Sequence, residues 1–229
     1  MRPPQPHTSA TRSAPRLRVR RQPSRGRYDR ASVEAVLDGG LFCHVACADG
    51  DHPYCVPMLH ARLDDHVYVH GSTASRLVRT LAGGANACLT VTRLNALVLA
   101  RSAFEHSANY ESVMVHGRFR LVEGAEERLA AFEAFTNRLI PGRWDEVRPP
   151  DRKELKASQI LAMPIGEAAV KARTGPPSDD DSEDAERATW AGVVPVVTSF
   201  GEAQRSPGLR SGIPVPASVR RLRKVDGCA

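Results

Sequence analysis

The 229-residue sequence has no uninterrupted apolar run that approaches the roughly 18 residues needed for a transmembrane helix. Its first residues, Met1-Arg-Pro-Pro-Gln-Pro6, also lack the apolar core of a secretory signal. The hydrophobic fraction of 41% is ordinary for a folded globular chain. These observations argue against membrane and secreted classes, so we expect a soluble protein of the cytoplasm.

Cysteine is scarce, and its count of five is odd, which argues against a disulfide framework. Cys43, Cys47, Cys55 and Cys88 lie in apolar stretches, where a free thiol packs as a small hydrophobic group. The segment from Cys43 to Cys47 contains His44 and has some likeness to a metal site. No second Cys/His pair completes a zinc site at a suitable spacing. We therefore expect buried free thiols and no metal.

The net charge of +6 is concentrated in separate segments rather than spread along the chain. Residues 1–30 contain nine arginines and one acidic residue, Asp29, whereas residues 178–186 are mainly acidic. Such blocks are usually solvated segments. A basic arm is able to contact nucleic acid, but no aromatic residue precedes Tyr28 to stack on a base. Nucleic-acid binding is therefore the weaker interpretation.

Composition divides the chain into four parts. We expect a disordered arm rich in Arg and Pro at residues 1–25, then one folded domain at residues 26–171. An acidic linker and an apolar docking segment that contains Trp190 follow at residues 172–200. Residues 201–229 are again rich in Pro, Gly and Arg, and we expect a disordered tail there.

The folded part combines short strands with helices that do not alternate strictly. Helical spacing and capping residues predict helices at residues 31–37, 75–81, 126–139 and 153–157. Apolar runs bounded by turn residues predict strands at residues 41–47, 53–61, 66–70, 87–92, 96–100, 113–122 and 159–165. Pro57 cannot donate to a ladder, so its strand is expected at an edge or at a bulge. The pattern predicts a mainly β (α+β) fold, an antiparallel barrel decorated by helices.

The segment from His70 to Arg76 lies where a predicted strand ends and a helix begins. Unpaired backbone N–H groups at a helix start attract anions. Ser72, Thr73 and Ser75 add hydroxyl donors, and Arg76 adds a guanidinium fork that matches phosphate oxygens. The alternative is a capped helix with a surface arginine, because neither a Walker nor a Rossmann pattern is present. The segment is a candidate phosphate site.

Five motifs occur in order along the chain. They are Tyr54-Cys-Val-Pro-Met58, His70-Gly-Ser-Thr-Ala-Ser-Arg76, Leu97-Val-Leu-Ala-Arg-Ser-Ala-Phe104, His106-Ser-Ala-Asn-Tyr110 and Ser112-Val-Met-Val-His-Gly117. This succession resembles the pyridoxamine 5′-phosphate oxidase-related flavoproteins, in the branch that includes nitroimidazole-resistance proteins. The segments 141–144, 148–150 and 190–195 are similar to the same branch. The resemblance runs from about Arg25 to Pro195.

The resemblance implies a six-stranded antiparallel split β-barrel that forms a homodimer, with FMN in grooves at the interface. By position, it implies that the isoalloxazine ring lies along Val56, Pro57 and Met58. It places His70 and Gly71 beside the ribityl chain, and Ser75 and Arg76, with Ser72 nearby, at the phosphate. It implies that Asn109 and Ser112 reach the flavin of the partner subunit. The catalytic candidates within these motifs are His70, His106 and Tyr110.

One departure narrows the functional prediction. The oxidase proper has a second cation directly after the arginine, where this chain has Leu77. Arg79, one turn later, offers partial compensation, and residues 190–202 lack a counterpart of the oxidase substrate segment. We therefore expect an FMN-dependent oxidoreductase acting on a small nitro or quinone-like molecule rather than a true pyridoxamine phosphate oxidase. The alternative is a non-catalytic flavin- or haem-binding protein, and FAD and deazaflavin remain open as cofactors.

Overall fold

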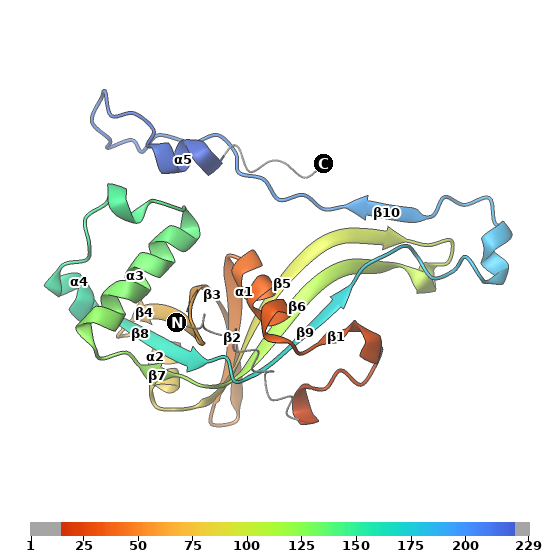
Figure 1. Ribbon diagram of the computed structural model, residues 1–229, viewed down its shortest axis with the longest axis horizontal. Coiled ribbons are helices and arrows are strands. Elements are labelled where there is room, and N and C mark those ends of the chain that lie inside the picture. Colours follow the sequence, from red (N-terminus) through yellow and green to blue (C-terminus); the bar gives the residue numbers. More distant parts are fainter. Residues whose placement is uncertain (1–14, 223–229) are drawn as a thin grey trace, which may run out of the picture.

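The computed structural model of the protein describes residues 15–222 (Figure 1). Within them, ten strands form one continuous antiparallel sheet in the order β1-β9-β6-β5-β2-β3-β4-β8-β7, with β10 paired to β5. This confirms the predicted class, mainly antiparallel β with helices, although the sheet has more strands than the six expected. The expectations for residues 1–14 and 223–229 lie outside the described residues.

The strands vary widely in length, from two residues to fourteen. They are β1 (Gly26–Arg27), β2 (Phe42–Asp49), β3 (His52–Leu63), β4 (His66–Ser72), β5 (Asn86–Leu99), β6 (Ser107–Arg118), β7 (Arg120–Leu121), β8 (Ser158–Pro164), β9 (Glu167–Arg173) and β10 (Gly192–Pro195). The long strands β5 and β6 curve away from the body of the molecule as a ribbon, and β10 lies along it (Figure 1). The sheet therefore has a curved body and a projecting β5–β6 ribbon.

Five α-helices lie among the described residues. They are α1 (Arg30–Gly39), α2 (Arg76–Ala82), α3 (Ala125–Leu139), α4 (Arg152–Ala157) and α5 (Ala217–Leu222). Of these, α1, α2 and α4 begin at side-chain caps. The Asp29 carboxylate accepts a hydrogen bond from the Ser32 backbone N–H, which satisfies one of the unpaired donors at the start of α1. Among residues 15–222, no helix combines the length and apolar character that crossing a bilayer requires.

Two apolar clusters pack on opposite faces of the sheet. In β4, Val67 and Val69 enter the main cluster with α1 and α2, whereas Tyr68 between them enters a second cluster with α3. This follows from the alternation of side chains along a strand. The α3 residues Ala131 and Phe135 cover that second face. The sheet is thus covered by α2 on one side of β4 and by α3 on the other.

Several predicted boundaries differ from the structure. The segments 87–92 and 96–100 form one strand, β5, with a register shift between Leu94 and Ala96. Strand β9 was not predicted, and it extends the folded sheet through Arg173, beyond the expected domain end at residue 171. Its residues are rich in Ala, Glu and Lys, which are weak strand formers. Pairing with β6 on one edge and β1 on the other overrides that preference.

The terminal regions contain more regular structure than expected. In the N-terminal arm, residues 15–25 include two 3-10 helices, Pro15–Leu17 (η1) and Pro23–Arg25 (η2), and the Leu17 side chain is buried. The docking segment around Trp190 supplies β10. The chain then runs outside the sheet to α5 (Figure 1), where Ser218 donates its backbone N–H and its hydroxyl to the Glu146 carboxylate. These contacts give both regions defined attachments.

Candidate functional site

The first component of the site is an unpaired strand edge. Strand β3 pairs with β2 along residues 52–59, but with β4 only at residues 60–63. Within the described chain, the second edge of β3 is therefore open from His52 to Leu59. Pro57 lies in this stretch opposite His44, which confirms the expected edge position. Its neighbour Val56 is 37% exposed, so the strand presents accessible apolar surface beside free backbone groups.

The second component is the start of α2, which lies against the same strand. The Arg76 guanidinium carbon is 4.1 Å from the centroid of the Tyr54 ring in β3. A Cβ atom at Gly71 would lie 2.7 Å from Val78 Cγ2 and 3.9 Å from Met58 Cε, so glycine permits this close approach. The fold therefore gathers three of the predicted residues, Met58, Gly71 and Arg76.

The charge of Arg76 is available for a ligand. Among the described residues, no carboxylate forms an ion pair with Arg76. The Tyr54 ring beneath it orients the guanidinium through a cation–π contact without neutralising it. An oriented and unneutralised guanidinium beside an open strand edge is suited to hold a phosphate or carboxylate group.

The backbone contribution to this anion site is smaller than the sequence suggested. The Thr73 N–H donates to the Ala157 carbonyl at 3.2 Å, and the Ser75 N–H donates to the Ser72 carbonyl at 2.9 Å. The Ala74 N–H donates to the Ser72 hydroxyl at 3.1 Å. Three N–H groups of the loop are thus used within the chain. The Ser75 hydroxyl accepts from the Val78 N–H at 3.4 Å, which leaves its own proton free to donate to an anion.

His70 lies on the opposite side of β4 from Gly71. Its ring meets Phe135 edge-on at a centroid distance of 4.7 Å, and the Phe132 ring is 6.0 Å away. Burial lowers the pKa of His70, so the imidazole is neutral at pH 7. Among residues 15–222, no hydrogen bond engages either ring nitrogen of His70. The result is a neutral imidazole with an aromatic wall and free nitrogen atoms.

The other two catalytic candidates lie elsewhere in the chain. His106 follows the 3-10 helix η3 (Ala103–Glu105), and its Nδ1 is 2.9 Å from the Ser102 carbonyl oxygen. Tyr110 is on β6, which β5 and β2 separate from β3. Ser112 is on the same strand, and its hydroxyl accepts a hydrogen bond from the Thr92 hydroxyl. A single chain therefore does not bring these residues to the α2 start.

Asn109 is committed to a turn of its own chain. Its side chain is buried, its amide nitrogen donates to the Gly175 carbonyl at 3.1 Å, and its oxygen accepts from Arg173 at 2.6 Å. Within one chain Asn109 thus supports the turn after β9, and its expected contact to a partner's flavin stays a prediction. Sequence reasoning missed Arg173, because β9 itself carried no recognisable strand pattern.

The cysteines divide into two groups. Cys43 and Cys47 are buried, and burial raises the pKa of the Cys43 thiol to about 12, so it is inert at neutral pH. Cys88 is partly exposed, and Cys55 is exposed, contrary to the expectation that these thiols are buried. Cys55 lies in the stretch of β3 that has only one neighbouring strand. No cluster of three or more potential metal ligands occurs among residues 15–222.

Comparison with known families identifies this arrangement. The model of the family described as pyridoxamine 5′-phosphate oxidase matches residues 29–172. The chain belongs to the pyridoxamine 5′-phosphate oxidase family. The match begins at the N-cap of α1 and ends within β9, so it includes both the open edge of β3 and the start of α2. The resemblance drawn from the sequence motifs is confirmed.

Solved structures of this family extend the likeness almost to the whole chain. The flavocytochrome Anf3 from Azotobacter vinelandii is 36% identical, with a TM-score of 0.84 over 91% of this chain and 96% of its own. The FAD- and haem-binding protein from Mycobacterium smegmatis is 37% identical, with a TM-score of 0.83 over 87% and 97%. A candidate 5-nitroimidazole antibiotic resistance protein from Bacteroides thetaiotaomicron shares the fold at 20% identity and a TM-score of 0.53, over 64% and 85%. No curated protein sequence matches the chain.

Proposed function

We propose that this protein binds a flavin nucleotide along the open edge of β3, with a phosphate group held at the start of α2. The open backbone edge and the exposed Val56 suit the edge and face of a flat heteroaromatic ring. The Arg76 guanidinium and the Ser75 hydroxyl suit its phosphate. The residues present therefore fit a flavin, although the grip depends on side chains more than on backbone N–H groups.

The name of one relative favours FAD over the expected FMN, and the names of both relatives add haem as a second group. The relative at 36% identity is named as a flavocytochrome, and the relative at 37% identity is named as an FAD- and haem-binding protein. Both likenesses span at least 87% of this chain and 96% of theirs, and this shared extent is the observation that carries the proposal. We assign FAD and haem to this chain. A bound flavin supplies transfer of one or two electrons, and haem iron supplies one-electron transfer.

His70 is the residue that we assign to the haem iron. Iron ligation requires a neutral imidazole with an unoccupied nitrogen, and burial keeps His70 neutral. Phe132 and Phe135 provide an apolar wall of the kind that surrounds a porphyrin. By contrast, His60 is 1% exposed, its Nε2 lies 2.9 Å from the Leu37 carbonyl, and its Nδ1 is buried where no group from outside reaches it. This role replaces the expected placement of His70 beside the ribityl chain.

A homodimer is the third element of the proposal. Large apolar side chains on the sheet are exposed in a single chain, among them Phe42, Val56, Leu94, Leu97 and Met114. An apolar group of this kind usually marks an association surface. A second copy that covers it would bring the β6 residues of one subunit toward the β3 edge of the other. Ser112 then becomes a candidate contact to the partner's flavin.

The decisive test is the absorption spectrum of the purified protein, followed by mass identification of the released cofactors. We expect flavin bands in the near ultraviolet and blue together with a Soret band. His70→Ala should remove the Soret band and leave the flavin bands, whereas His116→Ala, at another partly buried imidazole, should keep both. A full Soret band in His70→Ala would refute the haem assignment, and a colourless protein would refute the whole proposal. Sedimentation should give a dimer.

Oxidoreductase activity is tested on the same sample. Reduction of the flavin by a nicotinamide cofactor, followed by reoxidation by a nitro compound or a quinone, would establish a catalytic cycle on a small molecule. If the bound flavin is neither reduced nor reoxidised by these reactants, the protein is a cofactor-binding protein without that activity. The absorbance of the flavin reports both half-reactions directly.

A further inference from the structure

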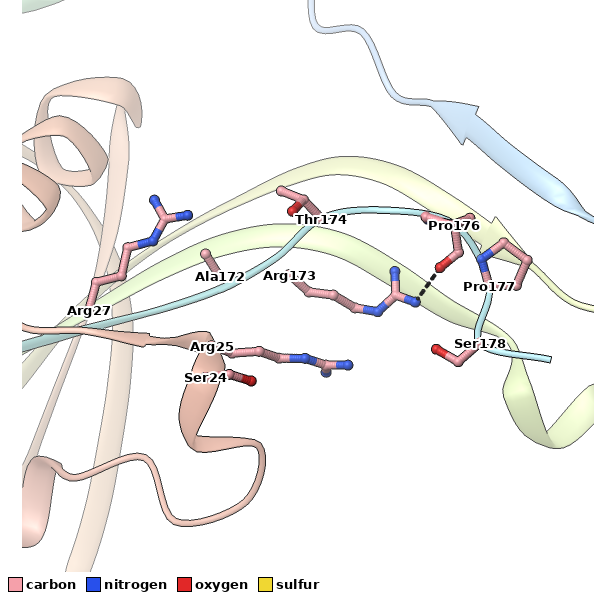
Figure 2. A pocket seen from close by; sticks show the side chains of 9 residues that line it. All are labelled: Ser24, Arg25, Arg27, Ala172, Arg173, Thr174, Pro176, Pro177 and Ser178. Atoms are coloured by element: carbon pink, nitrogen blue, oxygen red, sulfur yellow. Dashed lines mark hydrogen bonds between the residues drawn. The ribbon is translucent and has the colours of Figure 1, made fainter. Parts of the chain in front are cut away.

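A second basic pocket lies far from α2, between the 3-10 helix η2, strand β1 and the end of β9. Its volume is about 430 Å³ (Figure 2). Its polar lining consists of three arginines and three hydroxyl residues, namely Arg25, Arg27, Arg173, Ser24, Thr174 and Ser178. An alanine and two prolines complete the lining. No acidic residue of the described chain is part of the lining. The pocket is thus polar and strongly positive.

The arginines of this pocket form no ion pair within the described chain, although the charge of Arg27 acts on the nearby Asp29 carboxylate and adds to the Ser32 hydrogen bond that lowers its pKa. Arg173 is 7% exposed, and its guanidinium donates only to neutral groups, namely the Asn109 side chain and the carbonyls of Gly175 and Pro176. Between residues 15 and 222, no carboxylate forms an ion pair with Arg25, Arg27 or Arg173. A buried charge without a partner is costly. An anion from outside the chain would remove that cost.

The acidic residues that follow Ser178 along the sequence pair with an arginine outside the pocket. Asp179 and Asp180 directly follow Ser178, but both pair with the Arg101 guanidinium, at 3.3 and 2.9 Å. Asp179 also accepts the Arg101 backbone N–H at 2.6 Å. Arg101 therefore holds the acidic residues that would otherwise compensate the pocket. Burial lowers the pKa of Arg173, and the nearby positive charge of Arg25 lowers it further.

The two inner arginines are arranged to act on one ligand. In Figure 2 the side chains of Arg25 and Arg173 extend in the same direction, toward Ser178, while Arg27 stands at the other end of the pocket. Three hydrogen bonds fix the Arg173 guanidinium, so its orientation is preorganised. Guanidinium forks with adjacent hydroxyls match the several oxygens of a phosphate better than a single carboxylate.

We propose that this pocket binds the phosphate groups of a small molecule, either inorganic diphosphate or the diphosphate of a nucleotide. No aromatic side chain lines the pocket, so it holds the phosphates while the remainder of a nucleotide extends outside. The elements that form it, β1 and β9, lie apart from α2 in Figure 1, so this site is separate from the flavin grip at Arg76. The inference therefore does not depend on the proposed flavin site.

The test is titration calorimetry of the purified full-length protein with inorganic diphosphate at low salt, compared with ADP and NADPH. The double variant Arg25→Gln/Arg27→Gln should weaken diphosphate binding at least tenfold, because it removes the Arg25 guanidinium contact and the positive charge of Arg27 at the other end of the pocket. Arg152→Gln/Lys153→Gln removes the same charge from exposed positions on α4 and should change the dissociation constant by less than about twofold. Tighter binding of ADP or NADPH than of diphosphate would identify a nucleotide as the source of the bound phosphate groups. Tighter binding of diphosphate than of either nucleotide would identify the free anion as the ligand.

Two results would overturn the proposal. One is the absence of binding by diphosphate and by both nucleotides. The other is binding that survives in Arg25→Gln/Arg27→Gln but is lost in Arg76→Ala, which would place the phosphate at α2. Failure of the flavin proposal alone gives a different result, namely intact diphosphate binding in a colourless protein. If the double variant does not fold, Arg25→Gln alone is compared with Arg152→Gln and should weaken binding at least threefold.

Discussion

Replacement of Arg76 by alanine isolates the contribution of one side chain to flavin binding. In the free protein the Arg76 guanidinium lies 4.1 Å from the Tyr54 ring centroid and has no ion-pair partner among the described residues. Its removal therefore leaves no buried charge unpaired. Arginine and alanine are both strong helix formers, so α2 should persist. The loss of the cation–π contact should cost about 0.5–1 kcal/mol of folding stability at this site.

The effect on binding should be larger than the effect on folding. A hydrogen bond between charged groups contributes about 1.5–3 kcal/mol. Its loss should raise the dissociation constant of the flavin by roughly 10- to 150-fold. Because three N–H groups of the 72–75 loop are used within the chain, they cannot replace the lost guanidinium. Both FAD and FMN should be affected, since each carries a phosphate on the ribityl chain.

The assay is titration of cofactor-free protein with FAD and with FMN, in which quenching of the flavin fluorescence reports binding. Arg79→Ala is the matched control, because it removes the same charge from the next turn of the same helix. We expect a loss of about threefold or less for this control, consistent with Arg79 as a partial substitute. An unchanged dissociation constant for Arg76→Ala, or an equal loss in both variants, would refute the assignment of Arg76 to the phosphate.

Three further predictions concern folding stability. Leu81 is fully buried in the main core, so Leu81→Ala should lower the free energy of unfolding by about 2–5 kcal/mol in urea titrations; a loss below about 1 kcal/mol would contradict the packing described. The hydrogen bond from the Ser32 N–H lowers the pKa of Asp29, so the cap contributes at neutral pH and is lost as the pH falls through that lowered pKa. Asp29→Ala should thus cost about 1 kcal/mol at pH 7, and the difference should vanish in acid. Burial lowers the pKa of His60 below 6.5, so the unfolded state binds more protons and stability should decrease as the pH falls below about 6.5. His60→Gln should reduce that slope in urea midpoints measured between pH 8 and 5, and an unchanged slope would exclude His60 as its source.

Most of the fold was predictable where local signals and burial agree. The helix α1 begins after Asp29 as its cap signal predicts, and Pro57 lies in the stretch of β3 whose second edge is unpaired. Strand β9 was not predictable, because Glu, Ala and Lys in its sequence favour other conformations. Its stability comes from its two neighbouring strands and from the main core, which buries Ala168, Val170 and Ala172. Local preference is a weak guide wherever tertiary pairing supplies most of the free energy.

The site was predictable in part for a similar reason. The motifs identified Met58, Gly71 and Arg76, and the fold brings these residues together. The orientation of His70 toward α3 was not evident, because it depends on which face of β4 the α3 helix covers. The pocket between Arg25 and Arg173 was also not evident, since its members are far apart in the sequence and share no motif.

Strand β5 runs from the body of the sheet into the projecting β5–β6 ribbon. Its pairing limits where this chain tolerates insertions. One of its edges pairs with β2 at residues 87–90 and then with β10 at residues 96–99, while the other edge follows β6 throughout. The irregularity between Leu94 and Ala96 separates the two halves. One residue added or deleted there would invert the inward and outward positions of every later side chain on β5. The register of β5, rather than any single contact, therefore determines whether β10 pairs correctly with the sheet.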